Sequence, residues 1–256
     1  MSKCRTRIYH YLRFMLTRLL LVGLLLQTSS LYAQEFSVDS NGLSSAEKHL
    51  QDFYYSQRRS ESSIYSGTMH YGYSSTIEGI PYFQSNDWQN GSLVYENVLY
   101  KNVLMRYDEV KGKLIVTENP NGGISISLFS PRVSEFSFAG SRFVYFNKKN
   151  EKSSLAEGFY RQIVAGKITA YARTVKEIIE KIEGNTLLRK IEAKTKYYIL
   201  KNGEYYSVTN KKNLLNILKE HKKEVQQQLS ANGFRYRLDP ENSIISAVQK
   251  YNETED

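Results

Sequence analysis

The chain has 256 residues, with 35 lysines and arginines against 26 aspartates and glutamates, a formal net charge of +9 and a single cysteine, Cys4. One cysteine excludes an intramolecular disulfide framework and a cysteine-ligated metal site, so stability has to come from burial of an apolar core. The length suits one substantial domain, alone or with a small appendage.

The first 33 residues have the pattern of a secretory signal peptide. The segment begins with basic residues and contains no acidic residue; the basic residues are Lys3, Arg5, Arg7, Arg13 and Arg18. An apolar run, Leu19–Leu26, follows them, and Ala33 comes after it. We expect cleavage between Ala33 and Gln34 and export from the cytoplasm. The apolar run is shorter than the roughly 20 residues that cross a bilayer, so no transmembrane span is expected after cleavage. The alternative is a retained signal anchor.

Cleavage changes what the charge implies. Removing the five basic residues of the signal from 35 leaves 30 against 26 acidic residues, a net charge of +4. Most of the basic excess therefore lies in the predicted signal peptide, and nucleic-acid binding, which a strongly basic chain suggests, is not expected of an exported protein.

Residues 34–62 are predicted to hold one amphipathic helix and a linker. The hydroxyl of Ser44 can cap the helix while Glu47 reaches back to the same turn. One helical face then carries the apolar residues Ala46, Leu50, Phe53 and Tyr54. The polar residues 56–63 are predicted to link this helix to the next region.

From residue 63 to residue 208 the apolar pattern alternates, which predicts a mainly antiparallel β domain. Runs with this pattern are 112–117, 124–128 and 133–138. Glycine-containing turns separate the strands at Lys111-Gly112, Asn121-Gly122-Gly123, Ala139-Gly140, Ala165-Gly166 and Asn202-Gly203. Ten or more strands in about 145 residues predict a meander closed into a barrel or folded into a sandwich, and the pattern leaves both open.

Residues 209–256 are predicted to form a helical segment packed on the β domain. One helix follows Thr209-Asn210 and ends near Gly233, with an apolar stripe of Leu214, Leu218, Val225 and Leu229. A short extended piece, 234–238, precedes a last helix that starts at Asp239-Pro240 and buries Ile244, Val248 and Tyr251. The fold class is therefore α+β, mainly antiparallel β with an N-terminal helix and a C-terminal helical appendage.

Known catalytic motifs are absent from the sequence. The histidines beyond the signal, His49, His70 and His221, do not stand at metal-ligand spacing. The sequence has no Gly-x-Ser-x-Gly elbow, phosphate-binding loop or dinucleotide fingerprint. No catalytic residue, metal or cofactor is therefore predicted.

One segment suggests a ligand site. It contains Tyr82, Asn86, Asp87 and the only tryptophan, Trp88, between glycine and proline bends. An aromatic ring beside amide and carboxylate groups is typical of a small-ligand pocket, here for a glycan. The alternative is that Trp88 is a core residue at one end of the β domain and Asp87 caps a turn.

Two groups of charged residues also allow both a functional and a structural interpretation. The densest cluster, Lys211, Lys212, Lys219, Lys222 and Lys223, could contact an acidic partner or an anionic surface, or could be the solvated face of a helix. Four carboxylates, Glu78, Asp87, Asp108 and Glu109, could supply acid and base for cleavage of a glycosidic bond, or could be ordinary surface acids.

Three motifs carry a resemblance. Gly79-x-Pro81-Tyr82-Phe83 with Asp87-Trp88, then Leu104-Met105-Arg106-Tyr107-Asp108, and a C-terminal run from Lys211-Lys212-Asn213-Leu214-Leu215 to Asp239-Pro240-Glu241 resemble an uncharacterised family of exported proteins from Gram-negative bacteria. The likeness covers most of the chain beyond residue 60. It implies an envelope location and, since the family has no established activity, no catalytic residues.

We therefore predict a non-enzymatic binding or interaction module of the cell envelope, periplasmic or secreted further, whose partner is an envelope protein or a glycan. One alternative is a hydrolase acting on an envelope or extracellular polymer. Another is a structural or assembly factor that works through the C-terminal helices.

Overall fold

The computed structural model describes residues 63–65, 67–147, 155–184 and 186–254. All of them belong to one compact unit, Gln57–Asp256. The predicted signal peptide, the expected cleavage between Ala33 and Gln34, and the expected helix and linker at 34–62 lie outside the described residues. Across the described part, no helix is both long and apolar enough to cross a membrane.

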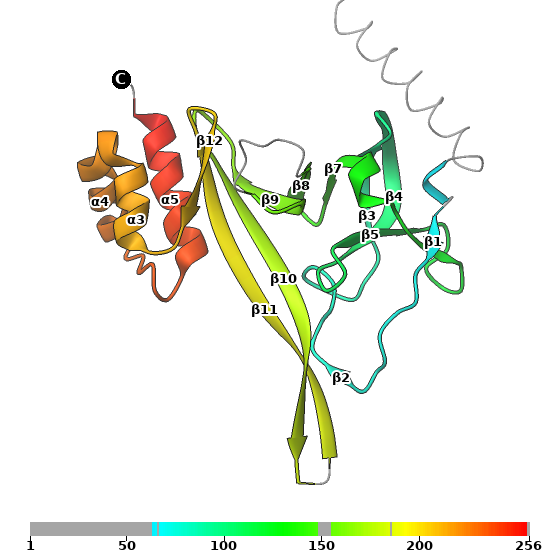
Figure 1. Cartoon of the computed structure of the whole chain (residues 1–256). Coiled ribbons are helices and arrows are strands. Elements are labelled where there is room, and N and C mark those ends of the chain that lie inside the picture. Colours follow the sequence, from blue (N-terminus) through cyan, green and yellow to red (C-terminus); the bar gives the residue numbers. More distant parts are fainter. Residues whose placement is uncertain (1–62, 66, 148–154, 185, 255–256) are drawn as a thin grey trace, which may run out of the picture. The chain divides into compact units, whose positions relative to one another are not determined.

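The described residues are mostly β-strand, followed by helices (Figure 1). The α-helices of the described residues, all C-terminal to the strands, are α3 (Lys211–Ile217), α4 (Lys222–Ala231) and α5 (Pro240–Glu253). The strands are β1 (Thr68–Met69), β2 (Ile77–Glu78), β3 (Gln89–Tyr95), β4 (Val98–Asp108), β5 (Lys113–Thr117), β6 (Ser125–Ser127), β7 (Val133–Phe138), β8 (Ser141–Phe146), β9 (Gly158–Val164), β10 (Thr169–Glu183), β11 (Thr186–Lys201) and β12 (Glu204–Val208).

These strands form one open sheet. Its order is β1-β6-β5-β4-β3-β7-β8-β9-β10-β11-β12, with β2 parallel to β11 beside this path and the other pairings antiparallel. The β-rich, mainly antiparallel prediction is confirmed, but the predicted barrel or sandwich is wrong, because β1 and β12 are opposite ends of the path and do not pair. Helices, rather than a returning strand, cover the sheet at the β12 end, so this end buries its apolar face without closing onto β1.

The strands from β3 to β9 enclose an aromatic core. Phe136 of β7 lies at its centre, with its ring centroid 4.7 Å from that of Phe143, 5.0 Å from Phe159 and 5.4 Å from Tyr107. All four side chains are buried. Residues two apart on a strand share one face, so Met105 and Tyr107 of β4 face this core while the residue between them faces away.

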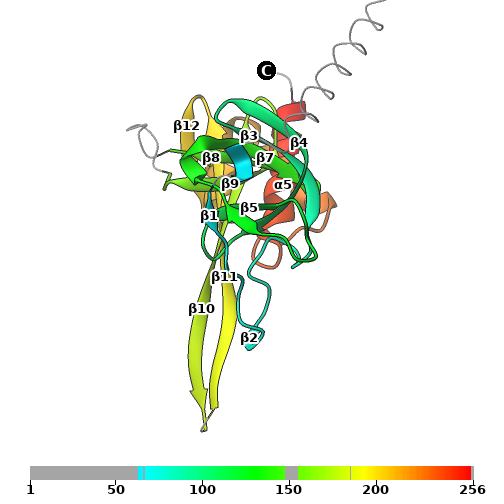
Figure 2. The same cartoon turned by 90° about the vertical axis from the view of Figure 1, so that its right-hand side faces the viewer.

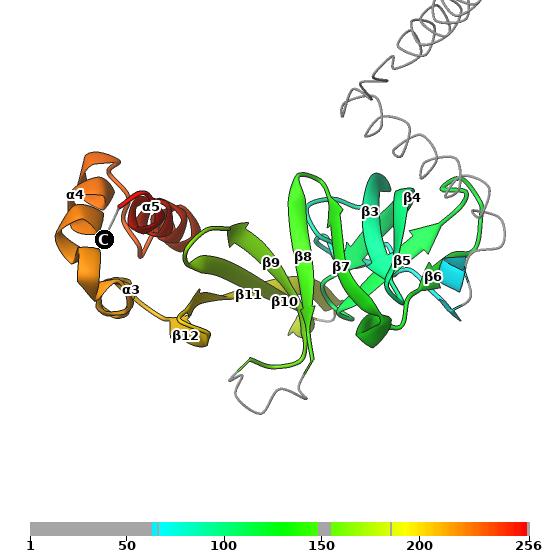
Figure 3. The same ribbon diagram turned by 90° about the horizontal axis from the view of Figure 1, so that it is seen from above.

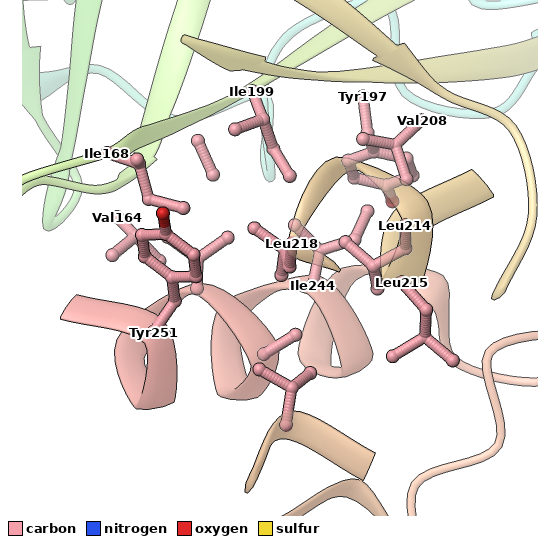
Figure 4. Packing of buried hydrophobic residues seen from close by; sticks show 14 of the residues in the cluster. Val164, Ile168, Tyr197, Ile199, Val208, Leu214, Leu215, Leu218, Ile244 and Tyr251 are labelled. Carbon is pink, nitrogen blue, oxygen red and sulfur yellow. The ribbon is translucent and has the colours of Figure 1, made fainter. Parts of the chain in front are cut away.

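A second core joins the helical segment to the other end of the sheet. The predicted stripe Leu214, Leu218, Val225 and Leu229 is buried, as are Ile244, Val248 and Tyr251 of α5. Figure 4 shows Ile199 of β11 and Val208 of β12 directed toward Leu214, Leu218 and Ile244. Seen from above, α3 lies next to β12 and α5 next to β9 and β10, while α4 packs on the outer side of α3 and α5 (Figure 3). Each fully buried aliphatic side chain contributes about 1.5–3 kcal/mol by its removal from water.

Polar contacts fix the C-terminal helices in place. Asn210 accepts a hydrogen bond from the backbone N–H of Asn213 at 2.9 Å and so caps α3, and the side chain of Asp239 caps α5 in the same way. The side chain of Asn252 bonds both the N–H (2.9 Å) and the C=O (3.0 Å) of Ile168. A Cβ on Gly166 would lie 2.3 Å from Asn252 Nδ2, so this glycine is needed for close approach of α5.

The hairpin of β10 and β11 continues far past its neighbours (Figure 2). The pairing of β10 with β9 ends at Ala172, and the pairing of β11 with β12 ends at Tyr197. In the outer part of the hairpin, only β2 pairs with it in the described residues, at Arg189 and Lys190. Charged residues are frequent along its outer half, as at Glu180 and Lys181, and Ile182 near the tip is 74% exposed. Charges on free strand edges oppose edge-to-edge association.

Candidate functional site

The predicted ligand segment connects β2 to β3. Tyr82 is buried and bridges to Asp108, while Asn86 and Asp87 are exposed and Trp88 is half-buried. Trp88 belongs to none of the apolar cores of the described residues. The structure therefore places Trp88 at the surface of the β domain rather than inside it.

Trp88 is instead stacked on Arg106 of β4. The guanidinium carbon of Arg106 lies 3.7 Å from the ring centroid of Trp88 and 4.6 Å from that of Tyr82. Its Nη1 donates to the backbone carbonyl of Asn86 at 2.7 Å. Its Nε is buried and has no hydrogen-bond partner among the described residues. Burial lowers the pKa of Arg106, and the nearby charge of Asp87 partly opposes this.

Arg106 lines a cavity of about 380 Å³, here called the Arg106 cavity. Its walls come from the β1–β2 and β2–β3 connections, β4 and β11, and they are formed by Gly72, Tyr73, Ser74, Ser75, Ile77, Gly79, Pro81, Tyr82, Asn86, Arg106 and Ile191. Tyr82 and Asn86 were predicted for a ligand site; Asp87 and Trp88 do not line the cavity. Tyr73 and Arg106 were missed, although the alternation of β4 places Arg106 on the face opposite Met105 and Tyr107.

A buried polar network holds the cavity wall. The Tyr73 hydroxyl donates to both carboxylate oxygens of Asp108, at 2.9 and 2.8 Å, and two backbone N–H groups, of Val110 and Lys111, bond the same carboxylate. Burial and this carboxylate raise the pKa of Tyr73. Behind it, the Tyr82 hydroxyl lies 3.1 Å from Nε2 of His70, whose pKa burial lowers. These bonds fix both tyrosine rings.

The four candidate carboxylates are not brought together. Asp108 is fully buried and bonded as described, and Glu109 is paired with Lys176 at 2.9 Å. Glu78 and Asp87 are exposed. None of the four lines the Arg106 cavity, whereas glycoside hydrolysis needs two carboxylates facing one bond. In the described ranges no three His, Cys, Asp or Glu side chains form a group that could hold a metal.

A larger groove of about 1140 Å³ lies where β11 and β12 meet the helical segment; it is here called the basic groove. Its lining residues are Thr195, Lys196, Tyr197, Tyr198, Ser207, Val208, Thr209, Asn210, Lys211, Phe234, Arg235, Tyr236, Arg237 and Pro240. Four of these are cations and none is an acid. Within the part of the chain that the structure describes, Lys196, Lys211, Arg235 and Arg237 form no ion pair.

Aromatic rings form the walls of the basic groove. The Tyr236 hydroxyl donates to the backbone carbonyl of Val208 at 3.2 Å. The Tyr197 hydroxyl lies 3.4 Å from a carboxylate oxygen of Glu241, and burial with this neighbour raises the pKa of Tyr197 to about 12. The predicted extended piece at 234–238 is wrong: Leu238 and Asp239 both donate backbone hydrogen bonds to the carbonyl of Arg235, which makes a turn.

The predicted lysine cluster is divided by the fold. Lys211 lines the basic groove. The remaining four, Lys212, Lys219, Lys222 and Lys223, are exposed on the helical segment and do not line it. The other cations that line the groove are Lys196 of β11 and two arginines of the turn before α5, Arg235 and Arg237. These two segments lie apart in the sequence, so no local charge pattern groups them together.

No protein-family model matches this chain, and neither the curated proteins nor the solved structures contain a match to it. The resemblance to an exported family stays a prediction, and function has to be argued from the two sites themselves.

Proposed function

We propose that the protein is an exported, non-enzymatic binding module, and that the Arg106 cavity holds one negatively charged sugar residue of a glycan. The observation that carries the proposal is the environment of the Arg106 guanidinium. This guanidinium is clamped between two rings, makes one hydrogen bond to a backbone carbonyl, and faces a cavity lined with hydroxyl and amide groups.

Charge and shape both support an acidic sugar. A guanidinium that is partly removed from water is stabilised by an anion, and its planar fork matches a carboxylate. Ser75 and Asn86 make no side-chain hydrogen bond within the described residues, so they can bind sugar hydroxyls. The volume of about 380 Å³ is at the lower end of ligand pockets, which suits one or two sugar residues.

The two alternative functions have less support. Hydrolysis has no facing pair of carboxylates at either site. An assembly role through the C-terminal helices needs an apolar helix face to offer a partner, but the apolar faces of α3, α4 and α5 are buried in one core that the three helices share with the sheet.

The proposal is tested by titrating the purified protein with glucuronate and galacturonate, with glucose and acetate as controls, followed by NMR and calorimetry. Arg106→Gln should weaken binding of the sugar acids by about tenfold or more, equivalent to about 1.4 kcal/mol. A matched control, Arg142→Gln, removes an exposed arginine that pairs with Glu135 on β7 and should leave binding unchanged.

Thermal unfolding of both variants shows whether they remain folded. Binding of glucose as tight as that of glucuronate, or full binding by Arg106→Gln, would show that the cavity is not a site for acidic sugars.

A further inference from the structure

We infer that the basic groove is a second, independent ligand site, and that it takes a linear acidic polysaccharide. The groove lies between β11, β12 and the helical segment, whereas the Arg106 cavity is formed by the β1–β3 connections and β4. Only β11 contributes to both, through different residues. Loss of one site therefore need not affect the other.

The charge of the groove calls for an anion. Lys196, Lys211, Arg235 and Arg237 line it with no acid among its walls, and each is exposed. Cations gathered in one concave surface create a positive potential that attracts anions and raises their local concentration. Some exposed basic residues elsewhere on the protein have acidic partners, as Arg132 has Glu96 and Arg189 has Glu180, and others, such as Lys222, form no ion pair within the described residues. The groove differs from both because it gathers four cations, unpaired in the described part of the chain, in one concave surface.

The size and the lining of the groove favour a chain of sugars. Its volume of about 1140 Å³ exceeds that of most small-ligand pockets, so a single anion such as phosphate would leave most of it empty. Between the cations lie hydroxyl and amide side chains, Thr195, Ser207, Thr209 and Asn210, which suit sugar hydroxyls. The half-buried rings of Tyr198, Phe234 and Tyr236 can cover the apolar faces of sugar rings.

Two other polyanions fit less well. Single-stranded nucleic acid is held mainly by bases stacked on open aromatic faces, and the described residues of the groove include no exposed aromatic ring. A sugar chain needs only partial contact with the half-buried rings, because its hydroxyl groups can bond to the polar side chains between the cations. A membrane surface is bound by cations beside exposed apolar side chains. The large apolar residues that are exposed, such as Tyr206 and Leu238, do not line the groove.

The test compares two double variants that lose the same charge. Arg235→Gln with Arg237→Gln removes two groove cations; Lys222→Gln with Lys223→Gln removes two exposed cations of α4 outside the groove. The side chains of all four residues make no ion pair within the described ranges, so both variants should fold, as circular dichroism and thermal unfolding will show. The probe is an oligogalacturonate, and its fully methyl-esterified form is the uncharged control.

Both double variants are compared in the Arg106→Gln background, so that a galacturonate residue bound in the Arg106 cavity does not contribute to the measurement. In that background the groove variant should bind oligogalacturonate about tenfold or more weakly than its parent, while the α4 variant should keep at least most of its parent's affinity. Binding of the wild type should weaken as salt is added and be lost with the methyl ester. Equal weakening in both double variants, unchanged binding in the groove variant, or tighter binding of oligothymidylate or of phosphatidylglycerol vesicles than of oligogalacturonate would each overturn the inference. Failure of Arg106→Gln to affect monosaccharide binding would refute the proposed function alone.

Discussion

The ion pair between Lys176 of β10 and Glu109 is the most buried one among the described residues, with side chains 13% and 6% exposed. Lys176 Nζ lies 2.9 Å from Glu109 Oε2 and donates to the backbone carbonyls of Ile80 (2.9 Å) and Tyr82 (2.7 Å). It thus ties β10 to the segment that forms the Arg106 cavity. Burial raises the pKa of Glu109, and Lys176 opposes that rise.

Lys176→Met keeps the aliphatic stem and removes the charge. Breaking a buried pair costs roughly 3–5 kcal/mol when the other charge stays ionised. Glu109 can avoid part of this cost by taking up a proton, since its pKa rises further without Lys176. Because the folded variant then holds a proton that the unfolded chain releases above pH 4.5, its stability falls as pH increases, by up to about 1.4 kcal/mol per pH unit between the two pKa values.

Urea unfolding followed by Trp88 fluorescence, at about pH 5 and about pH 7.5, measures this effect. Lys176→Met should lose more stability at the higher pH. Adding Glu109→Gln to Lys176→Met should recover part of the stability that Lys176→Met loses at the higher pH, and should remove the pH dependence that this substitution added. If the loss is equal at both pH values, or if the double variant is no more stable than Lys176→Met, an uncompensated Glu109 charge is not what destabilises the protein.

Two packing predictions concern the two cores. Gly91→Ala places a Cβ 2.4 Å from the carbonyl oxygen of Ser137 and should lower the unfolding free energy by about 1–3 kcal/mol by overpacking. In the control Gly72→Ala the Cβ meets only one atom, at 4.0 Å, and the unfolding free energy should change by no more than about 0.5 kcal/mol. Equal effects of the two substitutions would contradict the predicted clash. Leu218→Ala, at a fully buried position, should lower the unfolding free energy by about 2–5 kcal/mol in the same urea assay. The control Leu238→Ala, at an exposed position, should lower it little. If both substitutions lower it by a similar amount, the helical segment adds little to the stability of the core.

The C-terminal helices were predictable because their signals are local. The apolar stripe, the Asp239-Pro240 start and the stop near Gly233 all act within a few residues, and Gly233 adopts a φ of 66° just after α4. The break between α3 and α4 was missed, since a 3₁₀ turn at Lys219–His221 keeps both helices on the same apolar face. A stripe alone does not show such a break.

Hairpin turns were partly predictable for the same reason. Ala139-Gly140 and Asn202-Gly203 both have positive φ at each position, as the glycines suggested. The turn between β3 and β4 uses Glu96 and Asn97, with φ of 51° and 65°, and carries no glycine, so it gave no comparable signal.

Whether a sheet closes into a barrel depends on contacts between residues far apart in the chain, and the local sequence pattern does not indicate such contacts. β3 pairs with β7 rather than only with its sequence neighbours, and β2 pairs in parallel with β11. Alternation of apolar residues reveals which face of a strand is buried but not which strand, or which helix, covers it. The predicted barrel or sandwich failed at this step, because helices cover the sheet beside β12.

The two candidate sites differ in what the sequence could reveal. Tyr82 and Asn86 were predicted for a ligand site because aromatic and amide residues cluster locally, while Arg106 reaches the same cavity from β4. At the basic groove, Lys196, Lys211 and the two arginines near 236 come from three separate segments. A net charge of +4 after removal of the signal argued against nucleic-acid binding, but net charge averages over acids that are paired elsewhere. A polyanion is attracted by the local excess of positive charge that folding creates. We expect that excess to appear as salt-dependent binding that is lost when Arg235 and Arg237 are replaced.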